Sequence, residues 1–171
     1  FWCIESDFEK HDGIIEAVSG YAGGHLDNPT YKQVSNGGTG HLEVVRVTYD
    51  PDILKYADLL EIFWANVDPL DDHGQFCDKG ESYKSAIFYG NEDEKALAEQ
   101  SKAAIAEKLG EPVATSIRED AKFYIAEDYH QNYYKTNSTK YSFYRWRCGR
   151  DSRLEDLWGD QALKRVEIFD E

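Results

Sequence analysis

Three cysteines and one glutamate are the residues of this chain best suited to chemistry. Cys3, Cys77 and Cys148 are far apart in the sequence, and their odd number does not fit a disulfide framework. No Cys-x-x-Cys pair or Cys/His cluster has zinc-site spacing. Two interpretations remain open, namely free thiols in a reducing compartment or redox chemistry with long-range pairing of cysteines.

The glutamate is Glu43, within the segment HLEVVRVTY at residues 41–49, which is typical of a β-strand. Side chains alternate between the two faces of a strand, so Glu43 shares a face with Val45, Val47 and Tyr49. An apolar face disfavours the ionised carboxylate and raises its pKa. Glu43 is therefore either salt-bridged at the strand end or used as a proton donor.

Strands and helices along the chain must position these residues. Hydrophobic patterns and turn residues predict the following elements: a helix over 3–11, a strand over 13–21, a strand over 41–49, a helix from Asp50 to about Val67, a strand over 84–90, a helix from Asn91 to Gly110, a strand over 113–118 and a short helix over 126–134. Two long loops, 22–40 and 70–83, are candidates for a site because long ordered loops are usually functional. The tail is aromatic and basic, and Ser152 is expected to open its final short helix.

Size and composition limit the fold and the partners. The chain has 171 residues, which predicts a single domain over residues 1–171. Alternating strands and helices over residues 41–118 favour a mixed α/β sandwich. The net charge of −14 argues against binding to nucleic acid or to anionic membranes. No apolar run approaches membrane-spanning length, and the sequence indicates no metal or cofactor.

Five motifs occur in an order that points to a known family. They are GYAGG, NPTY, TGHLEVVRVTYDP, DPL and DKGESYKSAIFY, and they follow the aromatic pair Phe1-Trp2. In this order the chain resembles the peptide methionine sulfoxide reductase A family, and the later segment AEDYHQNYY is also similar to it. The resemblance implies an α+β fold, a two-layer α/β sandwich with a ferredoxin-like mixed sheet. It also implies a long irregular C-terminal tail, residues 135–171, flexible enough to move.

The resemblance implies a thiol mechanism. In the family, the nucleophile is the cysteine immediately before the Phe-Trp pair, so it is expected just ahead of Phe1. The chain contains no methionine, so Phe1 is not expected to be the start of translation. The nucleophile would reduce methionine (S)-sulfoxide, free or in proteins, and become a sulfenic acid. A second thiol would convert that acid to a disulfide, which thioredoxin would reopen.

The matching positions imply roles for the remaining site residues. Glu43 matches the proton donor, and Phe1 and Trp2 match the aromatic wall that receives the S-methyl group. Tyr31 and Tyr83 match the family's tyrosines that hydrogen-bond the sulfoxide oxygen. Asp78 matches the family's acid that positions a water molecule.

The recycling thiol departs from the common family pattern, because Ser142 follows Tyr141 where many relatives have cysteine. Cys148 is expected to take this role, with neighbouring arginines favouring its thiolate. Cys3 is the alternative, and Cys77 is interpreted as a bystander. We expect a monomer in the cytoplasm, unless an N-terminal signal has been lost. A non-catalytic binder of oxidised methionine is the competing interpretation if the nucleophile is absent.

Overall fold

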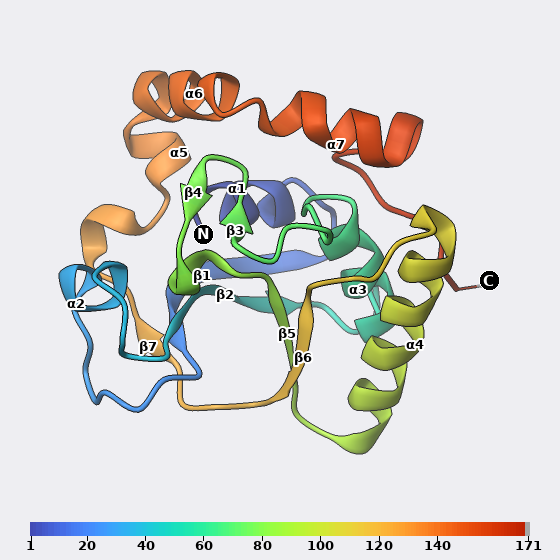
Figure 1. Ribbon diagram of the computed structural model, residues 1–171, viewed down its shortest axis with the longest axis horizontal. Coiled ribbons are helices and arrows are strands. Elements are labelled where there is room, and N and C mark those ends of the chain that lie inside the picture. Colours follow the sequence, from blue (N-terminus) through green and yellow to red (C-terminus); the bar gives the residue numbers. More distant parts are fainter. Residues whose placement is uncertain (170–171) are drawn as a thin grey trace.

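Two long antiparallel strands, β1 (Ile14–Ala22) and β2 (Leu42–Tyr49), form the centre of the computed structural model, which describes residues 1–169 (Figure 1). A short strand, β7 (Tyr124–Ile125), pairs antiparallel with the other edge of β1, so the order in this sheet is β2-β1-β7. The strands predicted over 13–21 and 41–49 are confirmed. The register places Tyr21 opposite Glu43.

A second pair of strands forms a parallel unit. Strand β5 (Ala86–Tyr89) runs parallel to β6 (Ser116–Glu119), and helix α4 (Glu92–Leu109) connects them. The predicted ends of α4 are confirmed. The side chain of Asn91 accepts a hydrogen bond from the backbone nitrogen of Glu94 at 2.9 Å. Gly110 ends the helix with a φ of 68°, a left-handed conformation that glycine adopts without steric cost.

Two helices cover one face of the β1–β2 pair. Phe8 of α1 (Trp2–Glu9) and Ile62 of α3 (Tyr56–Trp64) pack with Ala17 of β1 in one buried cluster. The prediction that α3 begins at Asp50 is wrong. The chain first makes a separate turn, in which the Asp50 carbonyl accepts a hydrogen bond from the backbone nitrogen of Leu54 at 2.9 Å. An extended residue, Lys55, then precedes the helix.

Both predicted loops contain short ordered elements. Within residues 22–40, α2 (Tyr31–Ser35) begins with a capping box in which Thr30 and Gln33 exchange hydrogen bonds. Within residues 70–83, a small hairpin of β3 (Gly74–Gln75) and β4 (Asp78–Lys79) precedes the 3-10 helix η1 (Glu81–Tyr83). Tyr31 of the first loop and Asp78 of the second line one cavity together with Trp2 of α1.

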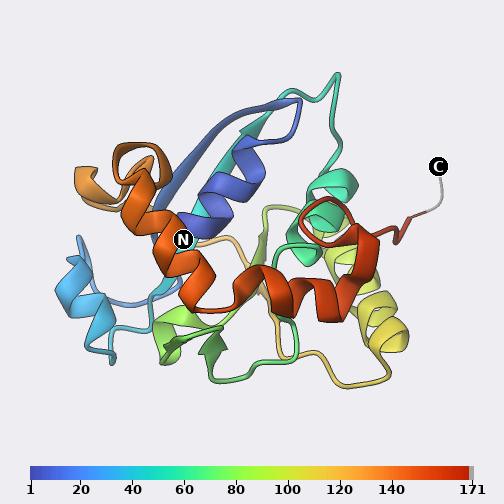
Figure 2. The ribbon, with the colours of Figure 1, turned by 90° about the horizontal axis from the view of Figure 1, so that it is seen from above.

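The C-terminal segment is helical, so the prediction of an irregular tail over residues 135–171 is wrong for the part that the structure describes. After η2 (Asp128–His130), the chain forms the following elements: α5 (Tyr133–Thr136), α6 (Ser138–Arg147), α7 (Arg150–Trp158) and η3 (Gly159–Gln161). The final helix begins after Gly149, before the predicted start at Ser152. Helices α6 and α7 run across one side of the molecule, and α6 passes over the start of α1 (Figures 1 and 2).

Buried contacts explain why this segment folds onto the body. Arg145 of α6 donates a hydrogen bond to Asp7 of α1 at 2.8 Å. Leu154 and Trp158 of α7 enter the core cluster that also contains Trp64 of α3. A sequence-local analysis cannot detect partners this distant along the chain.

The α+β class is confirmed. Parallel and antiparallel pairings both occur, as a mixed sheet requires, but within residues 1–169 they are divided among three separate sheets. Among residues 1–169, no helix combines the length and apolar character needed to cross a membrane.

Candidate active site

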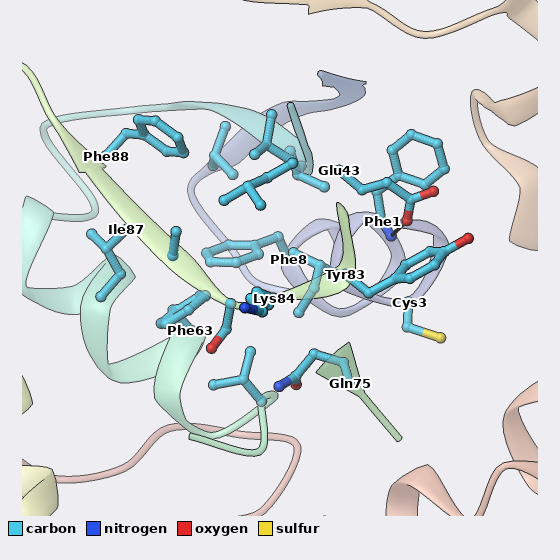
Figure 3. Close-up of a pocket in the computed structure, with 18 of the residues that line it drawn as sticks. Phe1, Cys3, Phe8, Glu43, Phe63, Gln75, Tyr83, Lys84, Ile87 and Phe88 are labelled. Atoms are coloured by element: carbon cyan, nitrogen blue, oxygen red, sulfur yellow. Dashed lines mark hydrogen bonds and ion pairs between the residues drawn. The ribbon is translucent and has the colours of Figure 1, made fainter. Parts of the chain in front are cut away.

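A cavity of about 410 Å³ collects most of the predicted site residues. Its lining comes from the start of α1, from β2, α3 and β5, and from the loop that carries β3, β4 and η1 (Figure 3). At one end lie polar groups, and between β2 and β5 the lining is apolar, with Val45, Val47 and Phe63. The predicted residues found in this lining are Phe1, Trp2, Cys3, Tyr31, Glu43, Asp78 and Tyr83. Such a mixture suits a small substrate with an apolar group and one polar oxygen.

Glu43 lies at the polar end, near the start of β2. Its side chain is only 9% exposed, and its Oε2 atom lies 3.4 Å from the backbone nitrogen of Phe1 (Figure 3). Burial raises the pKa of Glu43, and the nearby Asp78 carboxylate raises it further, while the charge on the Phe1 nitrogen opposes the rise. Glu43 is therefore buried, with the Phe1 nitrogen and Asp78 as its charged neighbours.

Phe1 and Trp2 form an aromatic wall at the start of α1. Trp2 stacks on Tyr133 with ring centroids 3.8 Å apart and an angle of 8° between the planes. Phe1 is tilted against Tyr21, with ring centroids 5.8 Å apart, and its side chain is 2% exposed. Aromatic rings packed in this way present a rigid apolar surface to a methyl or thioether group.

His130 supports this wall and was not singled out from the sequence. Its Nδ1 atom accepts a hydrogen bond from the indole nitrogen of Trp2 at 3.0 Å, and its ring lies 5.0 Å from that of Phe1 and 4.7 Å from that of Tyr31. Burial lowers the pKa of His130, which favours the neutral ring that this hydrogen bond requires. The sequence signal that could have identified His130 as a site residue is its position in the segment AEDYHQNYY.

Two tyrosines flank the polar end. Tyr31 is the first residue of α2, and its backbone nitrogen donates a hydrogen bond to Glu127 at 2.9 Å. Tyr83, at the end of η1, extends its hydroxyl towards the Phe1 and Glu43 region (Figure 3). Burial raises the pKa of Tyr83, with further contributions from Tyr31 and Glu43, so its hydroxyl keeps its proton.

Asp78 is joined to the C-terminal segment. The hydroxyl of Tyr144, on α6, donates a hydrogen bond to the Asp78 carboxylate. Burial and this hydrogen bond raise the pKa of Tyr144, whose ring also packs edge-on against Trp2 with centroids 5.7 Å apart. Tyr144 is a second site residue that sequence analysis missed, because only the folding of α6 over α1 brings it here.

The three cysteines differ in their pairing. Cys77 and Cys148 form a disulfide, so the interpretation of Cys77 as a bystander is wrong. Cys3 is free and 5% exposed, and its thiol points away from Glu43 (Figure 3). The partner of Cys148 is 71 residues away in sequence, which spacing alone cannot reveal.

Comparison with known proteins agrees with this geometry. A family model described as peptide methionine sulfoxide reductase matches residues 1–162. Peptide methionine sulfoxide reductase MsrA of Bacillus subtilis is 47% identical over 161 residues, which cover 93% of this chain and 91% of that protein. Peptide methionine sulfoxide reductase MsrA/MsrB of Vibrio cholerae is 49% identical over 162 residues, but the chain spans only 43% of its length.

Solved structures of methionine sulfoxide reductases are also similar to this chain. Mxr1 of Saccharomyces cerevisiae in reduced form has a TM-score of 0.76 and 32% identity, covering 81% of each chain. Methionine sulfoxide reductase A of Corynebacterium diphtheriae also has a TM-score of 0.76, with 30% identity over 80% of this chain and 70% of that one. By sequence, fold and site, this chain belongs to the peptide methionine sulfoxide reductase family, whose members are thiol-dependent enzymes that reduce methionine sulfoxide.

Proposed function

We propose that this chain reduces the S epimer of methionine sulfoxide, free or in proteins, with a cysteine bonded to the nitrogen of Phe1 as nucleophile. The observation that carries the proposal is the 3.4 Å separation between the Phe1 nitrogen and Glu43, inside an aromatic cavity. A residue attached at that nitrogen would stand beside the proton donor. It would also turn a charged amine into a neutral amide and remove one influence that lowers the pKa of Glu43.

The start of α1 favours a thiolate at this position. Phe1 is the N-cap residue of α1, so a cysteine bonded to it would lie just before the helix. The unpaired backbone N–H groups at a helix N-terminus carry partial positive charge, which lowers the pKa of a nearby thiol. The nucleophile would therefore be partly ionised while Glu43 keeps its proton.

The cavity walls then define how the substrate binds. The S-methyl group would lie against Phe1 and Trp2, and the sulfoxide oxygen would accept hydrogen bonds from the hydroxyls of Tyr31 and Tyr83. Asp78, held by Tyr144, would position a water molecule at the same end. The two epimers place their oxygen on opposite sides of the sulfur, so this fixed arrangement accepts one of them.

The chemical step transfers oxygen from the substrate to the cysteine. The thiolate attacks the sulfoxide sulfur while Glu43 gives its proton to the sulfoxide oxygen, so that a sulfur–sulfur bond forms, the sulfur–oxygen bond of the substrate breaks and hydroxide leaves. The hydroxide then bonds to the cysteine sulfur, and the sulfur–sulfur bond breaks. Methionine leaves, reduced by two electrons, and the cysteine, oxidised by two electrons, becomes a sulfenic acid. Removing a general acid of this kind typically lowers the rate by about 10²–10⁴-fold.

Once its disulfide with Cys77 is reduced, Cys148 is the thiol best placed to resolve the sulfenic acid, since it directly follows α6, the helix that carries Tyr144 into the site. Its thiolate would attack the oxidised sulfur, a disulfide would form, and the hydroxyl would leave as water. Cys3 fits this role less well because its buried thiol points away from Glu43. Thioredoxin is the proposed final reductant.

Three further proposals concern the domain organisation, the oligomeric state and the cellular location of the protein. We infer that the chain works as one domain, since the core cluster joins α3 and α4 to α7. We also propose that it acts as a monomer. A cytoplasmic location is proposed because reducing compartments keep such cysteines available for catalysis.

The decisive experiment uses the protein with cysteine before Phe1. It is supplied with dithiothreitol and with each separated epimer of an N-acetylated methionine sulfoxide amide. Methionine should form from the S epimer and not from the R epimer. Binding of the S epimer without any methionine formed would instead identify a non-catalytic binder of oxidised methionine.

A further inference from the structure

Glu5 is a buried carboxylate that the proposed chemical step does not use. It lies on α1 three residues after Trp2, so the two side chains project from the same side of the helix. Its exposed fraction is 0%. Burial raises the pKa of Glu5, and the hydrogen bonds that its side chain accepts oppose the rise. Because burying a carboxylate is costly unless it is hydrogen-bonded, the partners of Glu5 indicate what it does.

Both carboxylate oxygens of Glu5 accept hydrogen bonds from other elements. Oε1 accepts one from the backbone nitrogen of Asn132 at 3.0 Å, and Oε2 accepts one from the hydroxyl of Ser19, on β1, at 3.2 Å. Asn132 has a φ of 52° and is exposed, so it is the backbone of this residue that bonds to α1. Glu5 therefore joins three segments, namely α1, β1 and the turn that precedes α5.

Gln131 attaches the same turn to β1. Its side-chain amide accepts a hydrogen bond from the backbone nitrogen of Ser19 at 3.0 Å and donates one to the Ser19 carbonyl at 2.8 Å. The backbone nitrogen of Ala126 also donates to that carbonyl, at 3.0 Å. These bonds fix residues 126–132 against the sheet, whereas the carboxylate of Glu5 fixes them against α1.

The residues on either side of this anchor hold Trp2. His130 accepts a hydrogen bond from the indole nitrogen at 3.0 Å, and Tyr133 stacks on the indole with ring centroids 3.8 Å apart. The backbone N–H of Asn132, which bonds to Glu5, lies between these two positions in the chain. A shift of the turn away from α1 would therefore change both contacts of Trp2 at once.

We propose that Glu5 is a positioning residue for sulfoxide reduction, whose carboxylate fixes residues 130–133 against α1 and so orients the Trp2 ring that receives the S-methyl group. This rests on the proposed function, in which Phe1 and Trp2 bind that group. Glu5 itself does not line the cavity, so it acts through Trp2 and not on the substrate.

The kinetic test compares two substitutions in protein with cysteine before Phe1. Glu5→Met keeps the length of the side chain but leaves the Asn132 N–H without its acceptor, so kcat/KM should fall about tenfold, mainly through a rise in KM. Glu5→Gln keeps an oxygen for that N–H, and its kcat/KM should stay within about twofold of wild type. An unchanged KM in Glu5→Met would overturn the positioning role.

Glu61 provides the matched control, because it is also a buried carboxylate that accepts backbone hydrogen bonds. It is 3% exposed, its Oε1 accepts from the backbone nitrogens of Ile168 and Phe169 at 3.0 and 2.9 Å, and it lies outside the cavity lining. Glu61→Met should lower the Tm and leave KM unchanged. An equal rise in KM in both variants would show that losing any buried carboxylate is enough, which contradicts a specific role for Glu5.

A double substitution tests whether Glu5 acts through Trp2. Trp2→Phe already lacks the indole N–H that His130 accepts, so adding Glu5→Met should raise KM by no more than about twofold further. If the two effects on KM instead multiply in full, Glu5 acts by another route and the proposal is wrong.

Fluorine NMR of protein labelled with 5-fluorotryptophan follows Trp2 without any turnover. The chain has four tryptophans, and Trp2→Phe identifies the Trp2 signal. Glu5→Met should move this signal and leave the other three in place, and an unmoved signal would refute the proposal. If Glu5→Met does not fold, Ser19→Ala, which removes one partner of the carboxylate, takes its place with the same expected and refuting results. Absence of methionine formation by wild type would overturn the proposed function but would leave this measurement valid.

Discussion

The indole nitrogen of Trp2 donates a hydrogen bond to Nδ1 of His130 at 3.0 Å, across 128 residues of sequence. This contact fixes the second ring of the aromatic wall to the segment that precedes the C-terminal helices. His130 itself is 1% exposed, and its ring also meets those of Phe1 and Tyr31. The wall is therefore held from behind by a neutral imidazole rather than by contacts within α1.

Replacing His130 by phenylalanine should weaken substrate binding more than it slows chemistry. The ring remains, but the hydrogen bond that orients Trp2 is lost, which costs about 1 kcal/mol or roughly fivefold in kcat/KM. Most of this loss should be a rise in KM, and the emission of Trp2 should change. His25→Phe, at an exposed histidine, is the matched control. An unchanged KM together with a large loss of kcat would contradict a positioning role.

Glu43→Gln should slow the reduction step by about 100-fold or more, because glutamine cannot give a proton to the sulfoxide oxygen. Substrate binding should change little, since the amide keeps the shape of the carboxyl group. Rapid-mixing single-turnover measurements separate the two effects. Glu81→Gln, at an exposed glutamate two residues from Tyr83, provides the control. If Glu43→Gln reduces substrate at the wild-type rate, another residue supplies the proton.

The single-turnover rate should fall as pH rises through the raised pKa of Glu43. Burial raises this pKa, so the protonated form that acts as the acid persists above the usual pKa of about 4.3 for glutamate. At higher pH the carboxyl ionises and the proton donor is lost. The same falling limb should vanish in Glu43→Gln. A falling limb that survives in this variant would have to come from a different group.

Arg145→Met should destabilise the protein strongly. Arg145 pairs with Asp7 at 2.8 Å, and the Asp7 side chain is 2% exposed, so the substitution leaves a buried carboxylate without its closest partner. Removing one partner of a buried ion pair costs roughly 3–5 kcal/mol. That corresponds to a fall of about 6–20 °C in Tm for a chain of this size.

The matched control for Arg145→Met is Arg153→Met. Arg153 also pairs with an aspartate, Asp68 at 2.9 Å. The Asp68 side chain is 11% exposed, but that of Arg153 is 43% exposed, so water reaches this pair from the arginine side. Surface ion pairs contribute about 0–1 kcal/mol, so Tm should change by only a few degrees. Calorimetry of both variants in reductant gives the comparison, and equal losses would show that burial is not what makes the Arg145 pair important.

Much of the site could be predicted from the sequence, because the signals are local. The alternation of β2 alone placed Glu43 on an apolar face, and the motifs identified Tyr31, Tyr83 and Asp78, all of which line one cavity. Asn91 and Gly110 marked the ends of α4 correctly. Each of these inferences depends on residues within a few positions of one another.

The errors concern contacts between distant segments. The tail looked irregular because α6 and α7 are stabilised by Asp7 and by the core, not by their own sequence. Cys77 looked like a bystander because its partner is 71 residues away.

The sequence by itself determined the chemistry: an acid on an apolar strand face, an aromatic pair at a helix start, and tyrosines in loops of fixed order. Only the tertiary structure decided which thiols meet, what supports Trp2, and how the C-terminal helices close over the site. The physical reason is that strand alternation and helix capping are set by neighbours along the chain. Disulfide pairing and the burial of His130 and Arg145 depend on packing between segments that the chain order leaves free.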